Sequence, residues 1–410
     1  MKSALRIALI ASSRFPISQP FAGGLEAHVW HLARALAGLG HAVSVFAAPG
    51  SDKDLECQTL VVRPLDMSAA ARSDASMPAA TFMADHHAYL TLMLQLSGSA
   101  GDDFDIVHNH SLHYLPVAMA SLLSVPMLTT VHTPPTPWLE SAIDASVGLK
   151  TRFAAVSCHT AAEWFATLGP ITVVPNGIDS SRWPLGPGGG PLVWFGRMTA
   201  EKAPHLAIAA ARQAGRSLVL AGPISDPTYF AAEVAPHIGG EVRYVGHLDQ
   251  DQLARLVGQS AAALVTPMWD EPYGLVLAEA MCCGTPVVAF NRGGIPEFVA
   301  PQAGRLVAPG DTAAMAQAVE QAVQLPRKHV REHALRHCSS EAMVRTYLDL
   351  YREMIDAKFK HDRLLHSPSR FRPPGAGHEH CGATEPTGHR VDLPARSRSA
   401  PVRRDREATA

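Results

Sequence analysis

The chain has 410 residues, of which 47% are hydrophobic and 18% are charged, and its net charge at pH 7 is −2. This composition excludes a wholly disordered chain, a collagen-like chain and a polycation dedicated to nucleic acid. At roughly 150 residues per domain, the length predicts two or three domains with sizeable cores.

Cysteine usage and the first residues indicate a cytoplasmic protein. The six cysteines form no CxxC pair and no zinc-finger spacing, which favours reduced thiols. The apolar run at residues 7–11 is shorter than the core of a signal peptide and predicts a first β-strand. Because no stretch reaches the roughly 18 apolar residues of a membrane span, we expect no transmembrane segment.

Short apolar runs alternate with amphipathic patterns along residues 1–183, which we expect to form the first domain. Apolar residues at helical spacing predict a helix from Leu25 to Leu39. Strands are expected at residues 5–11, 42–48, 59–63, 105–108, 127–131, 153–157 and 171–174. Continuous runs of Val, Ile and Leu suit strands that are buried on both faces, and the strand–helix alternation predicts a parallel sheet.

The segment PLGPGGGP at residues 184–191 predicts a linker. A glycine-rich phosphate loop is the alternative, but such a loop follows a strand, opens a helix and carries Lys-Ser or Lys-Thr. The alternation then restarts over residues 192–338. Strands are expected there at residues 192–195, 217–221, 242–245, 262–265, 286–290 and 304–308. A helical pattern over residues 341–357 predicts a C-terminal helix within residues 339–360.

Two consecutive strand–helix sets predict an α/β fold of two doubly wound, Rossmann-like domains that face each other across a cleft. Open parallel sheets bind ligands beyond the carboxyl ends of their strands. We therefore expect the active site in this cleft, built from loops of both domains.

Residues 361–410 differ from the rest in composition. They contain six prolines, one aromatic residue and nine arginines against six acids. Because this segment offers too little apolar surface to offset chain entropy, it predicts a disordered tail. Its net charge of +3 leaves two interpretations open, a polyanion partner or a solvated extension.

The most informative segment is LVTPMWDEPYGLVLAEAMCCGTPVVAFNRGGIPE at residues 264–297. It follows an expected strand and opens a helix near Tyr273 or Gly274. The free N–H groups and positive dipole end of that helix would face the cleft and suit a phosphate. Glu271 and Glu279 could accept hydrogen bonds from sugar hydroxyls. From the residues alone, a capping role for Glu271 and a surface position for Glu279 stay open.

This segment resembles the E-x7-E signature of the retaining glycosyltransferases of family 4, which have the two-domain GT-B fold. Further motifs of that family are similar to FAGGLEAHVWHLARALAGLGHAVSVFA (21–47), DIVHNHS (105–111), VHTPP (131–135), VVPNGID (173–179) and GRMTAEKAPHLAIAAAR (196–212). The resemblance covers nearly all of residues 5–357.

The resemblance implies a role for each matching residue of the second domain. Glu271 would hold hydroxyls of the donor sugar, and Glu279 would hold the ribose hydroxyls of its nucleotide. Arg197 and Lys202 would neutralise the diphosphate. The backbone N–H groups that would bind the diphosphate are those around Gly274, Leu275 and Val276. Tyr273 stands where phenylalanine is common and would add a hydroxyl near the donor.

The resemblance also implies roles in the first domain. Gly23 and Gly24 would meet the donor phosphates or the acceptor, with a simple loop turn as the alternative. His132 would approach the donor sugar and the reacting centre, with a structural histidine as the alternative. The loops at residues 50–104 and 134–150 match nothing specific, which leaves the acceptor open between a sugar, a lipid-linked sugar and a small molecule.

Three segments could suggest a metal, but we expect none. Residues 103–105 spell the DxD motif of another glycosyltransferase fold, yet they lie at the start of a strand, the wrong end for this architecture. A second group lacks a carboxylate partner and comprises His108, Asn109, His110 and His113. The third, HEHC at residues 378–381, lies in the expected disordered tail.

The expected activity is transfer of a hexose from a UDP- or GDP-linked sugar to a hydroxyl acceptor, with retention at the anomeric carbon and without a metal or another cofactor. A nucleotide-sugar epimerase on the same fold and a non-catalytic nucleotide-sugar-binding protein are the alternatives. An NAD oxidoreductase is disfavoured because no G-x-G-x-x-G follows the first strand. We expect no nucleic-acid partner, and a peripheral contact with a membrane stays open.

Overall fold

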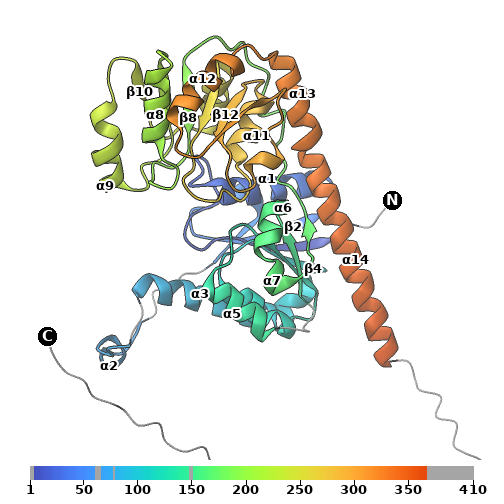
Figure 1. Cartoon of the computed structure of the whole chain (residues 1–410). Coiled ribbons are helices and arrows are strands. Elements are labelled where there is room, and N and C mark those ends of the chain that lie inside the picture. The colour runs from blue at the N-terminus through green and yellow to red at the C-terminus, as the bar shows by residue number, and fades with distance from the viewer. Residues whose placement is uncertain (1–3, 61–65, 77–78, 147–150, 367–410) are drawn as a thin grey trace, which may run out of the picture. The chain divides into compact units, whose positions relative to one another are not determined.

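A computed structural model describes residues 4–60, 66–76, 79–146 and 151–366, with side chains described through residue 358. Two parallel sheets, each covered by helices, make up its body (Figure 1). This arrangement confirms the expected pair of doubly wound α/β domains.

The first domain holds a seven-stranded parallel sheet in the order β3-β2-β1-β4-β5-β6-β7. Its strands are β1 (Arg6–Ile10), β2 (Ala42–Ala47), β3 (Cys57–Thr59), β4 (Ile106–Asn109), β5 (Met127–Val131), β6 (Thr151–Ala155) and β7 (Thr172–Val173). Strand β1 pairs with β2 and β4, so that Ile7 lies beside Val43 and Ile106. The strand expected at residues 59–63 forms earlier, and residues 61–63 lie outside the described residues.

Helices cover this sheet on both faces. The helices of the first domain are α1 (Gly24–Gly38), α2 (Ala69–Arg72), α3 (Ala80–Leu96), α4 (Tyr114–Met119), α5 (Pro137–Ala145), α6 (Cys158–Glu163) and α7 (Phe165–Leu168), with short 3-10 turns at Lys53–Leu55, Ser99–Asp103 and Ala120–Leu122. Of these, α2 buries no side chain and lies away from the sheet (Figure 1). Helix α1 buries Val29, Leu32 and Leu36 against the sheet, which explains the apolar spacing in its sequence.

The second domain holds a six-stranded parallel sheet in the order β10-β9-β8-β11-β12-β13. Its strands are β8 (Leu192–Phe195), β9 (Leu218–Ala221), β10 (Val242–Tyr244), β11 (Ala263–Val265), β12 (Val287–Phe290) and β13 (Gly304–Val307). Its helices are α8 (Pro204–Gln213), α9 (Pro227–Tyr229), α10 (Gln250–Gln259), α11 (Leu275–Cys282), α12 (Thr312–Ala322) and α13 (Arg327–His337), with short turns of other helical types at Phe230–Val234, Ala235–His237 and Ile295–Glu297.

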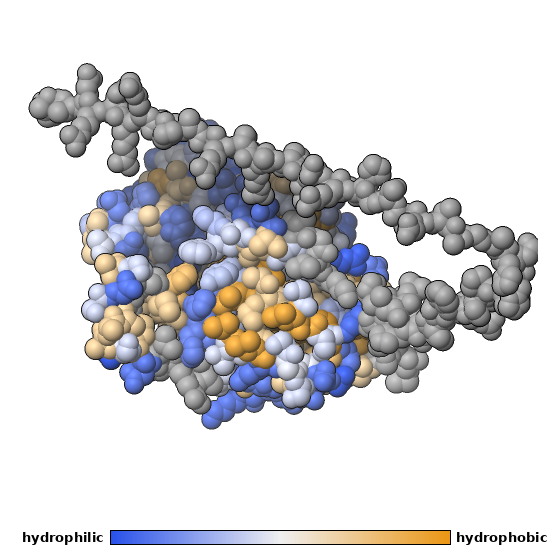
Figure 2. Space-filling view, turned by 90° about the horizontal axis from the view of Figure 1, so that it is seen from below, coloured by the Kyte–Doolittle hydropathy of each residue, from blue (hydrophilic) through white to orange (hydrophobic). Residues whose placement is uncertain are grey.

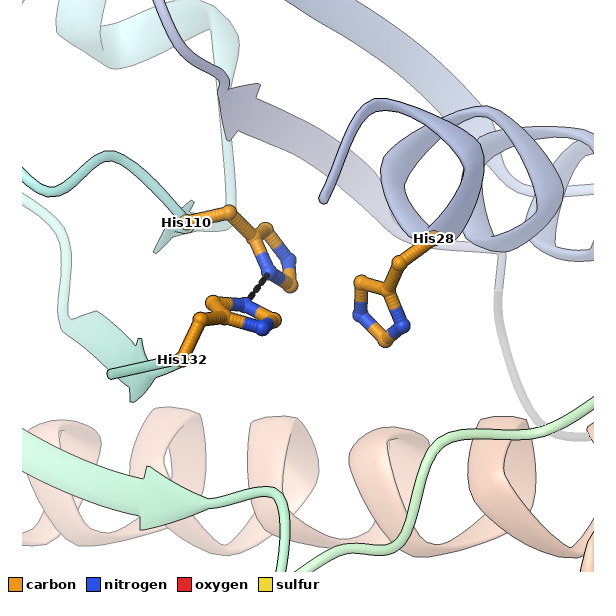
Figure 3. Close-up of side chains that lie close together, drawn as sticks. All are labelled: His28, His110 and His132. Atoms are coloured by element: carbon orange, nitrogen blue, oxygen red, sulfur yellow. Dashed lines mark hydrogen bonds between the residues drawn. The ribbon is translucent and has the colours of Figure 1, made fainter. Parts of the chain in front are cut away.

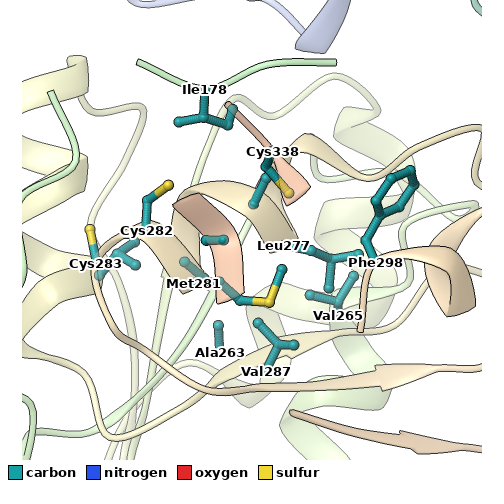
Figure 4. Close-up of a cluster of buried hydrophobic side chains, with 14 of the residues drawn as sticks. Ile178, Ala263, Val265, Leu277, Met281, Cys282, Cys283, Val287, Phe298 and Cys338 are labelled. Atoms are coloured by element: carbon teal, nitrogen blue, oxygen red, sulfur yellow. The ribbon is translucent and has the colours of Figure 1, made fainter. Parts of the chain in front are cut away.

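Helix α11 is anchored in the core of the second domain. Its residues Leu277 and Met281 pack among Val265, Val287 and Phe298, and each of these side chains is at most 8% exposed (Figure 4). At roughly 1.5–3 kcal/mol for each large apolar side chain, this packing holds the start of the helix in a fixed place. The adjacent cysteine pair 282–283 is buried in the same cluster, as expected for small packing residues.

The segment at residues 184–191 is fastened to the second domain. Its backbone N–H groups at Gly186 and Gly188 donate to the carbonyls of Cys283 and Gly258. A Cβ at Gly186 would lie 2.1 Å from the Gly258 oxygen, so this close approach requires glycine. The Arg327 guanidinium donates to the Gly186 and Gly258 carbonyls as well.

The last helix, α14 (Ser340–His366), returns to the first domain. Its residues Tyr347, Tyr351 and Met354 are buried in the same cluster as Ile7 of the first sheet. It extends beyond residue 360, so the expectation of a disordered tail from residue 361 is wrong for residues 361–366. The rest of that expected tail, residues 367–410, lies outside the described residues.

Two surface features bear on the expected partners. Within the described residues, no helix is both long and apolar enough to cross a lipid bilayer. Seen from below, one face of the molecule carries a group of hydrophobic residues among polar ones (Figure 2). Exposed large hydrophobic residues of the first domain include Leu94, Leu122, Trp138 and Phe165.

Candidate active site

A cavity of about 410 Å³ lies between the two domains at the carboxyl ends of their strands. Both domains contribute to its wall, as expected for two open parallel sheets. It is lined by every residue to which the family resemblance assigns a role, namely Gly23, Gly24, His132, Arg197, Lys202, Glu271, Tyr273, Gly274, Leu275, Val276 and Glu279. The structure therefore brings these residues together, and their individual roles stay predictions.

The N-terminus of α11 opens into this cavity. Its N-cap Gly274 has a φ of +87° and ψ of +64°, a left-handed conformation that favours glycine. The first N–H groups of a helix lack partners within the helix, so Leu275 and Val276 present donors to the cavity. A Cβ at Gly24 would lie 3.0 Å from the Leu275 side chain, which shows how closely the glycine loop of the first domain approaches this helix.

Lys202 and Glu271 form an ion pair on the cavity wall. The Lys202 Nζ contacts Glu271 Oε2, and the two side chains are 22% and 13% exposed. Trp269 donates from Nε1 to the same carboxylate oxygen at 3.0 Å, and Lys202 lies 5.1 Å from the centroid of its ring. Trp269 was not singled out from the sequence. The carboxylate is thus held by two donors in a partly water-excluded site.

Arg197 and Glu26 face the cavity from opposite domains. Arg197 pairs with Glu201 at 3.2 Å and keeps a side chain 40% exposed, so it is free to reorient toward an anion. Glu26 is only 5% exposed; burial raises its pKa, and the Arg197 charge lowers it in part. Sequence analysis missed Glu26, although its position two residues after Gly24 gave a signal.

Glu279 lies one turn into α11 with its side chain toward the cavity. Burial raises its pKa to about 8. Its carboxyl group is therefore mostly protonated at neutral pH. A surface position for this residue, which the sequence left open, does not match this environment.

The Tyr273 hydroxyl does not reach into the donor space that the sequence suggested. It donates to the backbone carbonyl of Asn176 at 2.6 Å, and its ring packs 4.2 Å from that of Phe298. Burial raises the pKa of this phenol well above its usual value. The hydroxyl ties α11 to the segment that crosses between the domains, and only the ring contributes to the cavity wall.

His132 follows β5 and enters the cavity from the first domain. Burial lowers its pKa to about 3, so the ring is neutral at physiological pH. Its Nε2 shares a hydrogen bond of 3.0 Å with Nδ1 of His110 (Figure 3). His110 in turn lies 3.1 Å from His108, and His108 lies 2.6 Å from the Tyr351 hydroxyl of α14.

The metal clusters considered from the sequence do not assemble as grouped. His113 stacks on Tyr89 at 4.6 Å, and Asn109 donates to Thr129. Among the described residues, the histidines that converge are His28, His110 and His132. The acid pair of the DxD segment lies at the amino end of β4, where Asp105 pairs with Arg6 at 2.7 Å. The third segment, residues 378–381, lies outside the described residues.

The two domains also meet through Glu297. Its two carboxylate oxygens accept from the backbone N–H groups of Cys158 and His159 at 2.8 Å and 2.7 Å. These donors begin α6, so a second-domain carboxylate caps a first-domain helix. The contact holds the second-domain loop at residues 291–297 against the first domain.

The fold and the cleft define a two-domain α/β protein with a site between its domains, and family models match most of the chain. Residues 22–182 match the model described as Glycosyltransferase Family 4. Residues 187–337 match the model described as Glycosyl transferases group 1. The chain belongs to glycosyltransferase family 4, and it is an enzyme that transfers a sugar.

Curated relatives and solved structures agree with this assignment. Glycogen synthase of Mycobacterium tuberculosis is 32% identical over 347 residues, which cover 74% of this chain and 83% of that protein. Phosphatidyl-myo-inositol mannosyltransferase of Propionibacterium freudenreichii is 26% identical, over 70% of this chain and 77% of that protein. Sucrose-phosphate synthase from Thermosynechococcus elongatus superposes with a TM-score of 0.69 at 22% identity, over 86% of this chain and 100% of that one. The structural match confirms the GT-B fold.

Proposed function

We propose that this enzyme transfers a hexose from a nucleoside diphosphate sugar to a hydroxyl group of an acceptor, with retention at the anomeric carbon. The observation that carries the proposal is the composition of the cavity wall. Two cations, Arg197 and Lys202, lie there with the N-terminus of α11 and two carboxylates, Glu271 and Glu279. Retention is supported by membership of family 4.

The positive groups suit the charge that the reaction develops. When the bond between the anomeric carbon and the phosphate oxygen breaks, negative charge accumulates on the leaving diphosphate. Fixed cations and helix N–H groups stabilise such charge without rearranging during the reaction. In this proposal Arg197, Lys202 and the N–H groups of Leu275 and Val276 supply that stabilisation, and no metal or other cofactor is needed.

The carboxylates suit the neutral parts of the donor. Glu271 would accept hydrogen bonds from hydroxyls of the sugar, and Glu279 would accept them from the ribose. In the structure the Lys202 ammonium pairs with the Glu271 carboxylate. Donor binding would have to break this ion pair and turn Lys202 toward the diphosphate. His132 would meet the sugar from the opposite domain, and closure around the donor would exclude water.

The relatives support a carbohydrate or polyol acceptor. Their names include glycogen synthase, D-inositol 3-phosphate glycosyltransferase and phosphatidyl-myo-inositol mannosyltransferase. We propose a hydroxyl of a sugar or polyol, free or lipid-linked, as the acceptor for this chain. Among donors, UDP- and GDP-linked hexoses are the first to test.

A donor screen followed by product analysis tests this proposal. Ligands that bind only the folded state raise its apparent stability, by about 2.7 kcal/mol at a hundredfold excess over Kd. One nucleotide sugar is expected to raise the melting temperature of the wild-type protein, and Lys202→Ala is expected to reduce that rise. With acceptor present, NMR should show a product with the anomeric configuration of the donor. An inverted product, or a new sugar isomer formed from the donor alone, would contradict the proposal.

A further inference from the structure

Three histidines from separate elements converge beside the active-site cavity. His28 lies on α1, His110 follows β4 and His132 follows β5, and their rings point toward one another (Figure 3). One ring nitrogen of each lies within 4.8 Å of the others. The ring centroids are 5.1 Å apart for both pairs that include His28 and 5.3 Å apart for His110 and His132. The three rings therefore surround one point.

His28 has no hydrogen-bond partner for either ring nitrogen among the described residues. Its side chain is buried, with only 3% exposed. A buried polar group left unpaired costs roughly 1–3 kcal/mol. His110 and His132 also direct a ring nitrogen toward His28. A ligand that accepts lone pairs from all three nitrogens therefore fits this position better than a single hydrogen bond does.

A network of hydrogen bonds alone accounts for only part of the cluster. The bond of 3.0 Å between His110 and His132 and the bond of 3.1 Å between His110 and His108 leave His28 unsatisfied. The Tyr351 hydroxyl contacts His108, which in turn contacts His110, so both contacts help to fix the orientation of the His110 ring. Second-layer partners of this kind orient metal-bound histidines in proteins.

We propose that His28, His110 and His132 bind one transition-metal ion of the Zn²⁺ class. Three imidazoles suit zinc, cobalt, nickel or copper, whereas calcium and magnesium require oxygen ligands. With metal–nitrogen distances of 2.0–2.1 Å, two ligands of a tetrahedral ion lie about 3.4 Å apart. The three ring nitrogens lie within 4.8 Å of one another, so the distance between any two of them would shorten by at most about 1.4 Å on metal binding. His132 lines the cavity, so a fourth ligand would reach the ion from there.

The proposed metal site shares His132 with the proposed donor contact, but it needs neither donor nor acceptor to form. A bound ion would hold His132 in one orientation at the edge of the cavity, and it would engage a nitrogen that otherwise faces His110. Metal binding can be measured without substrate, so failure of this proposal leaves the proposed transfer reaction untouched, and the reverse is also true.

Cobalt binding to the full chain tests the proposal. The tag is removed and the protein is treated with a chelator and dialysed; Co²⁺ is then titrated while visible absorption is recorded. Because residues 378–381 of the sequence offer His, Glu and Cys, the titration uses the double variant His378→Ala/His380→Ala. We expect one Co²⁺ per chain with the intense absorption of tetrahedral cobalt, displaced by one Zn²⁺.

Two substitutions at one position test the ligand set. In the same background, His28→Leu and His28→Gln should weaken Co²⁺ binding by a factor of about ten or more. The matched control is His113→Leu, which removes a half-buried histidine whose Nε2 atom is buried and unpartnered among the described residues, and it should bind Co²⁺ unchanged. Circular dichroism confirms that each variant is folded.

The outcomes are decisive in either direction. Absence of a tetrahedral spectrum, or equal affinity in the His28 variants and the control, overturns the proposal. If neither His28 variant folds, X-ray absorption on the Zn²⁺-loaded background protein decides the question. Three imidazole nitrogens at about 2.0–2.1 Å support the site, and fewer contradict it.

Discussion

Glu279 provides a proton-linkage test of how the nucleotide is held. Its pKa of about 8 means that about nine in ten of these side chains are protonated at pH 7 in the free enzyme. Hydrogen bonds from two ribose hydroxyls favour the ionised carboxylate and lower its pKa. Binding of the nucleotide at pH 7 should therefore release up to about 0.9 proton per site.

Isothermal titration calorimetry in two buffers measures this release. Tris takes up a proton with a large heat and phosphate with a small one, so the difference between the observed binding heats gives the number of protons. The wild-type protein should show a clear difference at pH 7. Glu279→Gln, which keeps a hydrogen-bonding side chain but cannot titrate, should bind the nucleotide with equal observed heats in the two buffers.

The matched control is Glu320→Gln on α12. Glu320 is a surface residue that pairs with Arg216, and that pairing lowers its pKa. The Glu320→Gln variant should release as many protons on nucleotide binding as the wild-type protein does. Equal binding heats in both buffers for the wild-type protein would contradict this role of Glu279, because Glu279 would then keep its proton or would not contact the ribose.

Four further predictions follow from named contacts. Gly274→Ala should raise the KM for the donor and destabilise the fold by about 1–3 kcal/mol, since its φ is +87° and the new Cβ would lie 2.8 Å from Leu277; steady-state kinetics and denaturant titration measure both. Glu297→Ala should expand the free enzyme in small-angle X-ray scattering and lower kcat/KM, because the cap on α6 is lost. Tyr351→Phe should lower the free energy of unfolding by about 1 kcal/mol, as one buried hydrogen bond disappears. As pH rises from about 4.5 to about 8, the free enzyme should lose stability, because Glu279 ionises earlier in the unfolded chain than in the folded one; melts of Glu279→Gln should lack this loss.

Most of the strands could be predicted because local sequence determines them, and the residues expected at the cleft line the cavity. Continuous apolar runs mark buried parallel strands, and the carboxyl ends of such strands meet at one edge of a sheet. Glu271 and Glu279 flank the start of one helix, so a strand followed by that helix is enough to place both near the cleft.

Other features depend on contacts between distant parts of the chain. The return of α14 to the first domain follows from its packing against Ile7, which no local pattern reveals. The hydroxyl of Tyr273 is taken by Asn176, 97 residues away in sequence, and this contact removes it from the donor space. The sequence did not identify His28 as a candidate ligand, because its position on an amphipathic helix is also typical of an ordinary core residue.

In the proposed function, Glu271 belongs to the machinery that transfers the sugar. The most direct measurement is nucleotide release from the donor identified by the screen, compared between wild type, Glu271→Ala and the neighbouring control Asp270→Ala. Asp270 is an exposed acid that pairs with Arg292 outside the cavity wall, so its loss should leave turnover close to that of the wild type. We predict that folded Glu271→Ala loses at least about a hundredfold in kcat/KM, about 2.7 kcal/mol of transition-state stabilisation. Turnover of Glu271→Ala close to that of Asp270→Ala would contradict the account.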